Sequence, residues 1–588
     1  MNIFMNTTKT NMLKRKSKNY YLTVFVIGII TGLLIFIPFL IVDNGLFLYY
    51  GDFNVQQIPF YKLAHDALNN NNFPWSWNTD LGANFVGSYS FYLLGSPFFW
   101  ITKLFPSVAV PYLMAPLLIL KFGLTCVTGY AFINRFTKKS SSALIGALLY
   151  AFSGFNIYNI FFNHFNEVVL IFPLLLIALE ELVINNQRGG FALAVALCAT
   201  VNYYFFFGQI IFVVIYFIIR CTSKDFNINF KKFLIICFEA VIGLLLSAVL
   251  LIPSILAIIK NSRLDERLMG YDMLFYNDEQ RYGLILSSLL FPPDVPAKAN
   301  FFENSNAKWS SVSAFLPLFS ISGVIAFVKG KKKHWANKLI LISLIMSFIP
   351  ILNASFSAFN YSYYARWFYM PILIMAMMTA IAIENDIKHF KFGLKINAIL
   401  VGVFLLVGII PKNENDKSKW FSLPKDKEMF WGFAIIAILG LLICTIFCLY
   451  KKAYKNIQKI ASYCLVGIII IYGICSIAVG KSLSGENYYD DVAVKALHGS
   501  ENIKIDDDDF YRIDTFDELD NLGMFWHMKT INAFHSIVPT SVTEYYDKID
   551  EERGVASRPN PDCIGVRGLM NVKYSFIKQT SSNANLLA

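Results

Sequence analysis

Apolar runs of about 20 residues recur along most of this chain, and they constrain its fold more than any other feature. Each run is long enough to cross the roughly 30 Å hydrocarbon layer of a bilayer as a helix. Of the 588 residues, 56% are hydrophobic and only 15% are charged, whereas ordinary soluble domains carry about 25% charged residues. The sequence therefore predicts a polytopic α-helical membrane protein and excludes a typical soluble enzyme.

The formal net charge of +11 would suggest a nucleic-acid partner in a soluble protein. Here the Lys and Arg residues lie in short loops between apolar runs, where such residues set the orientation of the spans. We therefore expect no nucleic-acid partner. Cysteine usage indicates neither a disulfide framework nor a CxxC metal site.

About thirteen spanning helices are predicted. The first run is too long for the apolar core of a signal peptide and has no small-residue cleavage site, so we expect it to remain as a helix. The predicted spans are 20–42, 110–134, 141–160, 167–184, 190–205, 206–220, 233–259, 313–329, 337–355, 366–385, 393–411, 429–450 and 460–480.

Loop charges orient these spans. With the basic segment 1–19 in the cytoplasm, every even-numbered loop also falls there, and each one carries Lys or Arg, as the positive-inside rule requires. Counting Phe85–Phe105 as a span would place Lys138, Lys139 and Lys332 outside, so this run is predicted to be re-entrant or interfacial. Membrane residues 20–480 then expose two long outer loops, 43–110 and 260–312. The polar tail 481–588 is predicted to be an extracytoplasmic α+β domain.

The first outer loop holds the main catalytic candidate, Asp52, among aromatic and amide side chains. A carboxylate at the membrane surface in such surroundings has a raised pKa and is suited to act as a general base or a metal ligand. The alternative is that Asp52 caps a following helix over 55–69. Asp43, nearer the end of the first helix, is the second candidate, either as the catalytic group, as a cap or as the second carboxylate of a metal pair.

Three further positions carry charge near the same surface. Arg366 lies in an aromatic belt at the outer start of its helix, where it is suited to bind a phosphate or to anchor the helix. Lys121 lies near the centre of an apolar run, where an ammonium needs a partner or a cavity. His164 and Glu167, with Asn163, fall at a short outer turn, where they orient sugar hydroxyl groups, share a metal ion with Asp52 or simply cap the turn.

Many short pieces of this sequence, in their order and spacing, resemble the bacterial YfhO family over about residues 20–577. They are Gly51-Asp52, Gln56-Gln57, Pro59-Phe60, Leu81-Gly82-Ala83-Asn84, Ser96-Pro97-Phe98, Lys121-Phe122-Gly123-Leu124, Tyr150-Ala151-Phe152-Ser153-Gly154, Tyr364-Ala365-Arg366-Trp367-Phe368-Tyr369-Met370, Phe510-Tyr511-Arg512-Ile513 and Val566-Arg567-Gly568-Leu569.

The resemblance implies a GT-C-type membrane glycosyltransferase that uses a lipid-phosphate-linked sugar on the outer face of the membrane. It implies that Asp52 is the catalytic acidic residue of the first outer loop, with Gln56 and Gln57 beside it as substrate-binding residues. The implied partners are a polyprenyl-phosphate sugar donor, the membrane lipid around it and a cell-surface glycopolymer such as lipoteichoic acid. A divalent cation stays open as a cofactor. Family members are usually longer, so a truncated tail is one interpretation of residues 481–588.

Two other classes compete with this hypothesis. A transporter or flippase of lipid-linked sugars would be expected to show inverted repeats with matching broken helices, and no convincing repeat is present. A passive membrane anchor for the tail would not need Asp52, Lys121 or Arg366. The asymmetry of one long first loop favours the enzyme.

Overall fold

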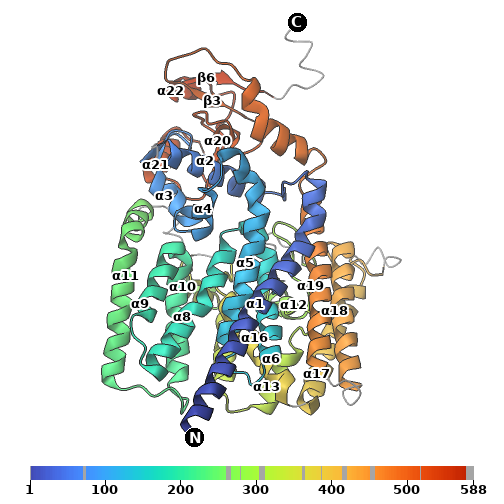
Figure 1. The fold of residues 1–588 in the computed structure, drawn as a ribbon. Helices are drawn as coiled ribbons and strands as arrows, with labels where there is room; N and C mark the ends of the chain where they lie inside the picture. Colours follow the sequence, from blue (N-terminus) through green and yellow to red (C-terminus); the bar gives the residue numbers. More distant parts are fainter. Residues whose placement is uncertain are drawn as a thin grey trace.

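The computed structural model shows a long helical bundle with a smaller cap at one end (Figure 1). It describes residues 2–70, 74–259, 267–278, 280–302, 312–360, 364–385, 387–412, 420–449, 457–516, 518–551 and 553–577. The longer helices of the bundle are α1 (Asn2–Val42), α5 (Val110–Ile133), α6 (Ser140–Ala151), α8 (Phe165–Asn185), α9 (Gly190–Val201), α10 (Tyr203–Arg220), α11 (Phe230–Ile258), α14 (Trp335–Phe348), α16 (Tyr369–Asn385), α17 (Ile387–Ile409), α18 (Lys427–Leu449) and α19 (Ile457–Lys481).

Eight stretches in the described part of the chain are long and apolar enough to cross a membrane. They are Tyr20–Val42, Ser107–Ile133, Ser140–Phe162, Tyr203–Arg220, Phe230–Ile258, Lys388–Ile409, Lys427–Leu449 and Gln458–Lys481. Each of them coincides with a predicted span, so the class of polytopic helical membrane protein is confirmed, whereas the number thirteen is not.

The other five predicted spans differ from single long helices in identifiable ways. Helices α9, α14 and α16 have 12, 14 and 17 residues, short of the roughly 20 that a span needs. Predicted span 313–329 forms only the nine-residue α13 (Ser322–Gly330). Helix α8 has 21 residues but carries three glutamates, at 167, 180 and 181.

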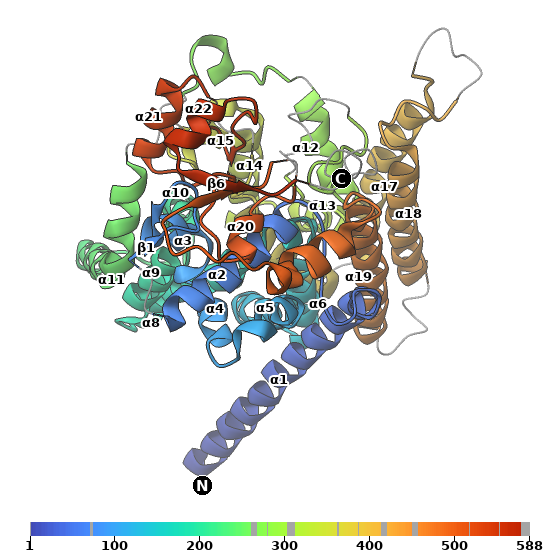
Figure 2. The same ribbon diagram turned by 90° about the horizontal axis from the view of Figure 1, so that it is seen from above.

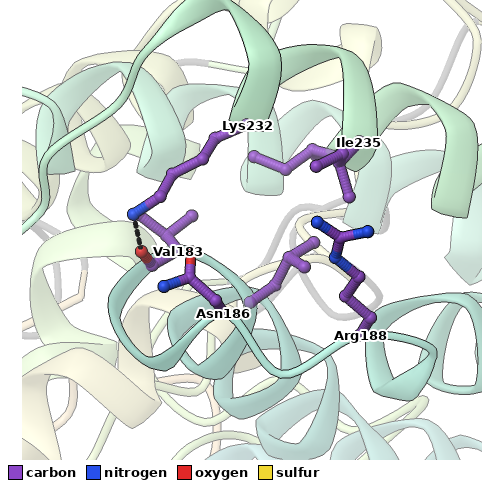
Figure 3. Close-up of a pocket in the computed structure, with 7 residues that line it drawn as sticks. Val183, Asn186, Arg188, Lys232 and Ile235 are labelled. Atoms are coloured by element: carbon purple, nitrogen blue, oxygen red, sulfur yellow. Dashed lines mark hydrogen bonds between the residues drawn. The ribbon is translucent and has the colours of Figure 1, made fainter.

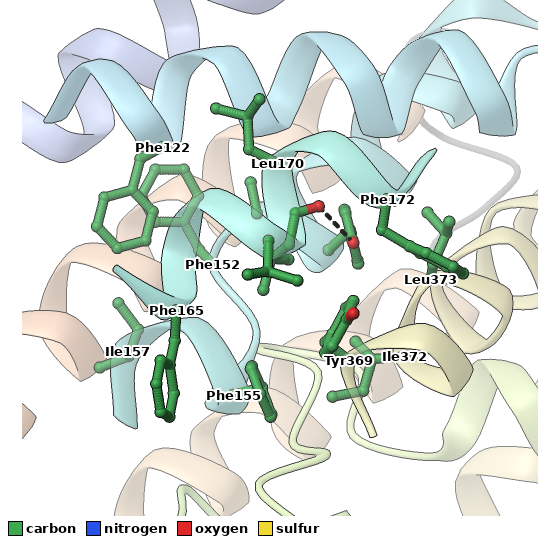
Figure 4. Packing of buried hydrophobic residues seen from close by; sticks show 14 of the residues in the cluster. Phe122, Phe152, Phe155, Ile157, Phe165, Leu170, Phe172, Tyr369, Ile372 and Leu373 are labelled. Atoms are coloured by element: carbon green, nitrogen blue, oxygen red, sulfur yellow. Dashed lines mark hydrogen bonds between the residues drawn. The ribbon is translucent and has the colours of Figure 1, made fainter. Parts of the chain in front are cut away.

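Aromatic side chains fill the centre of the bundle (Figure 4). The rings of Phe122 and Phe152 stack with their centroids 5.0 Å apart. Tyr369 of α16 packs against Phe155 and Phe172, each at 5.5 Å. Such pairs contribute about 0.5–1.5 kcal/mol beyond the area they bury, so helices distant in sequence are held in one core.

The segment predicted to be re-entrant consists of three short helices: α3 (Phe85–Tyr89), the π-helix η2 (Ser90–Leu94) and α4 (Pro97–Thr102). The Ser96 side chain caps α4 by accepting hydrogen bonds from the backbone N–H groups of Phe98 and Phe99. None of these helices exceeds six residues. The apolar helical stretch Phe85–Leu94 has 10 residues, short of the roughly 20 that a span needs, and its re-entrant or interfacial placement stays a prediction.

Short strands and helices form the cap after α19. Strands β3 (Arg512–Asp514) and β6 (Val572–Ser575) pair in parallel, and β4 (Ala533–Phe534) pairs antiparallel with β5 (Ala556–Ser557). Helices α20 (Leu522–Phe525), α21 (Thr540–Lys548) and α22 (Ile564–Leu569) accompany them. Seen from above, this cap lies over the first-loop helix α2 (Ile58–Asn69) (Figure 2).

Ion pairs fasten the cap to the first loop. The Arg553 guanidinium donates twice to Asp80, at 2.9 and 2.7 Å, and both side chains are buried. Arg512 donates to the carbonyl of Leu81 at 2.8 Å. The residues predicted as a separate outer domain are therefore joined to the loop that holds the catalytic candidate.

Candidate active site

Asp43, directly after the first helix, has both carboxylate oxygens occupied. It pairs with Lys481 at the end of α19, at 2.6 and 2.8 Å. It also accepts hydrogen bonds from the Leu48 backbone N–H and the Tyr488 hydroxyl, at 3.0 and 2.9 Å. The side chain of Asp43 is fully buried. This residue joins the first outer turn to the last helix of the bundle.

Asp52 has a different environment. It follows Gly51, whose φ of +50° favours glycine, and a Cβ there would lie 2.7 Å from the Phe161 ring. Asp52 begins the π-helix η1 (Phe53–Gln57), and its side chain makes no capping hydrogen bond. The interpretation of Asp52 as a helix cap is therefore wrong. Its side chain is partly buried, and its carboxylate interacts with the backbone N–H of Asp52 itself.

Burial raises the pKa of Asp52 to about 7. The positive charge of Arg366 opposes this increase in the pKa, and the carboxylate of Asp520 in the cap adds to it. Asp52 thus lies within electrostatic reach of a guanidinium from the bundle and a carboxylate from the cap. A carboxyl group with a pKa near the working pH is suited to general base catalysis.

Arg366 lies in the turn before α16, with its guanidinium against aromatic faces. It lies 4.2 Å from the ring centroid of Tyr364, 5.2 Å from Phe165 and 5.6 Å from Phe162. Tyr361 and Tyr363, which belong to the predicted aromatic belt around Arg366, lie outside the described residues. Aromatic faces hold a guanidinium in place and leave its N–H groups to bind oxygen atoms. Both the anchor and the phosphate-binding role therefore remain compatible with the geometry.

Behind Asp52, the first loop meets the turn between α7 (Gly154–Tyr158) and α8. His164 Nδ1 lies 3.2 Å from Gln57 Oε1, and both side chains are buried. Burial and the charges of Lys121 and Arg366 hold the pKa of His164 well below its usual value, so the ring is neutral at pH 7. Within the described part of the chain, Gln57 Nε2 and His164 Nε2 have no hydrogen-bond partner. These amide and imidazole groups are suited to bind hydroxyl groups.

Lys121 has the partner that its place in an apolar helix requires. Its ammonium lies 2.7 Å from Glu167 Oε1 and donates to the Asn163 side-chain oxygen at 2.7 Å. Both charged side chains are at most 2% exposed. The structure therefore brings Lys121 and Gln57 together with the three residues of the predicted outer turn, Asn163, His164 and Glu167, in one buried polar cluster.

The cap also contacts the π-helix η1, which was not predicted from the sequence. Asn521 donates to the backbone carbonyls of Val55 and Phe534, at 2.6 and 2.8 Å, and accepts from the Phe534 N–H at 2.8 Å. Gln56 also donates to the Phe534 carbonyl, at 3.4 Å. Strand β4 is thus bound to the π-helix that begins at Asp52. No local sequence pattern connects residues so far apart.

Asp294 of the second outer loop was also missed. Its side chain is 5% exposed, burial raises its pKa to about 7, and one oxygen accepts from the Asn300 N–H at 3.2 Å. The nearby Pro296 carbonyl accepts from the Tyr50 hydroxyl at 2.6 Å, so this loop touches the first loop. Residues 260–266, 279 and 303–311 of the second loop lie outside the described residues. Among the residues that are described, no group of three or more His, Cys, Asp or Glu side chains is arranged to hold a metal ion.

A sequence model of the family described as bacterial membrane protein YfhO matches residues 23–587. The chain belongs to this family. A curated relative, the uncharacterized protein YfhO of Bacillus subtilis (strain 168), is 24% identical over 579 residues. The match covers 90% of this YfhO-family chain and 61% of the relative, so the chain spans less than two thirds of that protein's length.

Two solved structures are similar to this YfhO-family chain. One is ArnT from Cupriavidus metallidurans bound to undecaprenyl phosphate, with a TM-score of 0.47, 11% identity and coverage of 87% of this chain and 85% of that one. The other is the Archaeoglobus fulgidus oligosaccharyltransferase in its apo form, with a TM-score of 0.44, 14% identity and coverage of 86% and 63%.

Proposed function

We propose that this YfhO-family protein is a membrane glycosyltransferase that transfers a sugar from a polyprenyl-phosphate donor to a glycopolymer on the outer face of the membrane. The observation that carries the proposal is Asp52, a half-buried carboxyl group with a pKa near 7 within electrostatic reach of Arg366. Glycosyl transfer from a lipid phosphate needs a base for the acceptor hydroxyl group and a positive group for the departing phosphate, and Asp52 and Arg366 are suited to these roles. The family resemblance implies the same centre.

In the proposed reaction, the Asp52 carboxylate removes the proton from the acceptor hydroxyl group. The acceptor oxygen then forms a bond to the anomeric carbon, and the bond between that carbon and the phosphate oxygen breaks. The departing polyprenyl phosphate carries the negative charge that Arg366 stabilises. The proton stays on Asp52 until the product leaves, so atoms and charges balance.

The buried polar cluster supports sugar binding in this proposal. Gln57 presents an amide N–H without a partner. Because the neutral His164 ring donates through Nδ1 to Gln57 Oε1, its Nε2 is an acceptor without a partner, and Gln56 lies beside Gln57 on η1. The Lys121–Glu167 pair keeps its charges fixed and paired at the base of the cluster. Hydroxyl groups of a sugar match such an array of fixed donors and acceptors.

The test is transfer of a radiolabelled sugar from a polyprenyl-phosphate donor in membranes that contain the protein. Asp52→Asn is expected to insert normally and to lose transfer by a factor of about 10²–10⁴, the contribution of a general base. Full activity in Asp52→Asn would end the glycosyltransferase hypothesis. Lipid and polymer analysis of a deletion strain identifies which surface glycopolymer, such as lipoteichoic acid, loses its sugar.

Arg366→Lys is the matched variant for the phosphate role. It keeps the positive charge but loses the planar, bidentate donor geometry, so turnover is expected to decrease by at least tenfold. An unaltered rate in Arg366→Lys would leave Arg366 as an anchor of the aromatic belt. A flippase of lipid-linked sugars would instead move donor across the bilayer without covalent transfer, which the same membranes would reveal.

A further inference from the structure

A small pocket lies at the other end of the bundle from Asp52, where α8 ends and α9 and α11 begin (Figure 3). Apolar side chains and three polar ones line it: Leu182, Val183, Ile235, Ile236, Asn186, Arg188 and Lys232. In Figure 3, Arg188 and Lys232 flank the pocket from two different segments. The proposed function gives no role to this pocket.

The two basic side chains are not neutralised by a carboxylate. Lys232 donates to the Val183 carbonyl at 2.6 Å, and neither Lys232 nor Arg188 forms an ion pair within the described ranges. The buried carboxylate of Glu239 lies on the same helix as Lys232. Its two oxygens accept from the Gly189 and Ala192 N–H groups, at 2.8 and 3.2 Å. Glu239 thus caps α9 and leaves the two cations for another anion.

The backbone adds to the positive potential at this place. Helices α9 and α11 both begin beside the pocket, and the N-terminus of a helix carries a partial positive charge. The Val183 carbonyl, near the negative end of α8, is already occupied by Lys232. A single negative charge between Arg188 and Lys232 is therefore favoured by the two side chains and by the start of α11, whereas Glu239 occupies the start of α9.

Next to the pocket, helix α11 exposes a row of apolar side chains. Helix α11 lies at the edge of the bundle (Figure 1) and has 29 residues, of which only a minority are buried. Large apolar side chains stand exposed along it: Phe233, Leu234, Phe238, Val241, Leu245, Val249 and Ile252. A molecule that fits both parts has a negative headgroup and a long hydrocarbon chain.

We propose that this pocket binds the phosphate headgroup of an anionic phospholipid of the surrounding membrane, with its acyl chains along α11. Basic pockets between transmembrane helices bind anionic lipid headgroups. The negative charge of one phosphodiester fits between Arg188 and Lys232, which form no ion pair with Glu239 in the described residues. The apolar side chains of the lining favour a headgroup that carries hydrocarbon chains over a free, hydrated phosphate ion.

The test uses the purified full-length protein in nanodiscs of phosphatidylcholine mixed with phosphatidylglycerol. Native mass spectrometry after gentle release measures how many molecules of each lipid stay bound. The wild type is expected to retain phosphatidylglycerol preferentially. The double variant Arg188→Gln, Lys232→Gln is expected to lose this preference by about tenfold or more.

A matched control removes the same charge from the same end of the molecule. Lys224 and Lys231 are exposed and do not line the pocket, so Lys224→Gln, Lys231→Gln should retain the lipid as the wild type does. The single variant Arg188→Gln changes an exposed side chain with no hydrogen bond in the described structure, and it keeps the test valid if Lys232→Gln impairs folding.

Three outcomes would overturn the proposal. Equal losses in the pocket and control variants would indicate attraction to general surface charge. Displacement of the lipid by inorganic phosphate at matched ionic strength would indicate a free-phosphate site. Equal retention of both lipids by the wild type would exclude any preference for an anionic headgroup.

Discussion

Two aspartates of the same outer loop have opposite surroundings. Asp43 accepts hydrogen bonds from an ammonium, a hydroxyl and a backbone N–H. The Asp52 side chain makes no capping hydrogen bond to η1, and its pKa is near 7. The carboxylate of Asp43 has hydrogen-bond partners at both oxygens, so it stabilises the fold. The carboxyl group of Asp52 titrates near pH 7, so it is suited to accept a proton during catalysis. Residue type alone does not distinguish them, since both were candidates from sequence.

Asp43→Asn is expected to destabilise the protein rather than to abolish transfer. The substitution leaves the Lys481 ammonium, 11% exposed, without its counter-charge, and removal of one partner of a buried pair costs about 3–5 kcal/mol. Thermal unfolding in detergent would show a lower midpoint, while the rate per folded molecule stays near that of the wild type. A normal midpoint combined with lost transfer would move the catalytic assignment from Asp52 to Asp43.

The pH dependence of transfer follows from Asp52. Its folded-state pKa of about 7 lies above the ordinary value of 3.8, so the carboxyl group is protonated, and inactive as a base, below pH 7. The rate of transfer is expected to increase about tenfold per pH unit up to pH 7 and to level off above it. Initial rates in buffers across that range measure this profile, and a rate that does not change with pH would exclude Asp52 as the base.

The buried polar cluster shows what sequence can predict at this scale. An ammonium inside an apolar helix must have a partner, so the Lys121 pair was foreseeable, and Glu167 provides it. Asn521 and Asp294 gave no such signal. An amide in a polar tail and an aspartate after two prolines are ordinary in sequence, and their burial arises only when distant segments meet.

At the scale of elements, the π-helix η1 connects the catalytic candidate to the cap. Asn521 binds this helix through the Val55 carbonyl while it also holds both backbone groups of Phe534. Its φ of +63° places the side chain at a left-handed turn before α20. Asn521 is thus a positioning residue for η1 and touches no reacting atom.

Asn521→Ala is expected to lower transfer several-fold and the free energy of unfolding by about 1–3 kcal/mol, because buried backbone groups lose their partner. Since Asn521 positions Asp52, the pH profile of transfer should shift with the rate. Asn44→Ala is the matched control: Asn44 also has a positive φ, of +53°, and its exposed side chain donates to Tyr489 at 3.0 Å. Equal effects of both variants on rate and pH profile would contradict a positioning role for Asn521.

Helix lengths explain which spans were predictable. Runs with continuous apolar character, such as Phe230–Ile258, form single long helices. The predicted span 337–355 instead breaks at Pro350 into α14 and α15 (Pro350–Ser355). Proline ends the preceding helix because its ring and missing N–H disrupt the hydrogen-bond ladder. A hydropathy profile detects the apolar residues of 337–355 but not the helix break at Pro350.

At the scale of the whole molecule, the last segments of the chain close over the first ones. Lys481 binds Asp43, Arg553 binds Asp80 and Asn521 binds Val55, so the end of α19 and two regions after it hold the first outer loop. The N-terminus lies at the opposite end of the bundle from this assembly (Figure 1). The first helix therefore crosses the whole bundle before the chain reaches Asp52.

The orientation of the protein in the membrane can be tested with two of its own cysteines. With the basic N-terminus in the cytoplasm, the cap and Asp52 face outside, and the basic pocket at Arg188 faces the cytoplasm. Two native cysteines report on this: Cys221 is exposed after α10, and Cys563 is part-exposed in the cap. In variants that keep only one of them, a membrane-impermeant maleimide should label Cys563 in intact cells and Cys221 only after permeabilisation. The reverse pattern would invert the protein and place Asp52 in the cytoplasm, where a sugar acceptor on the cell surface cannot reach it.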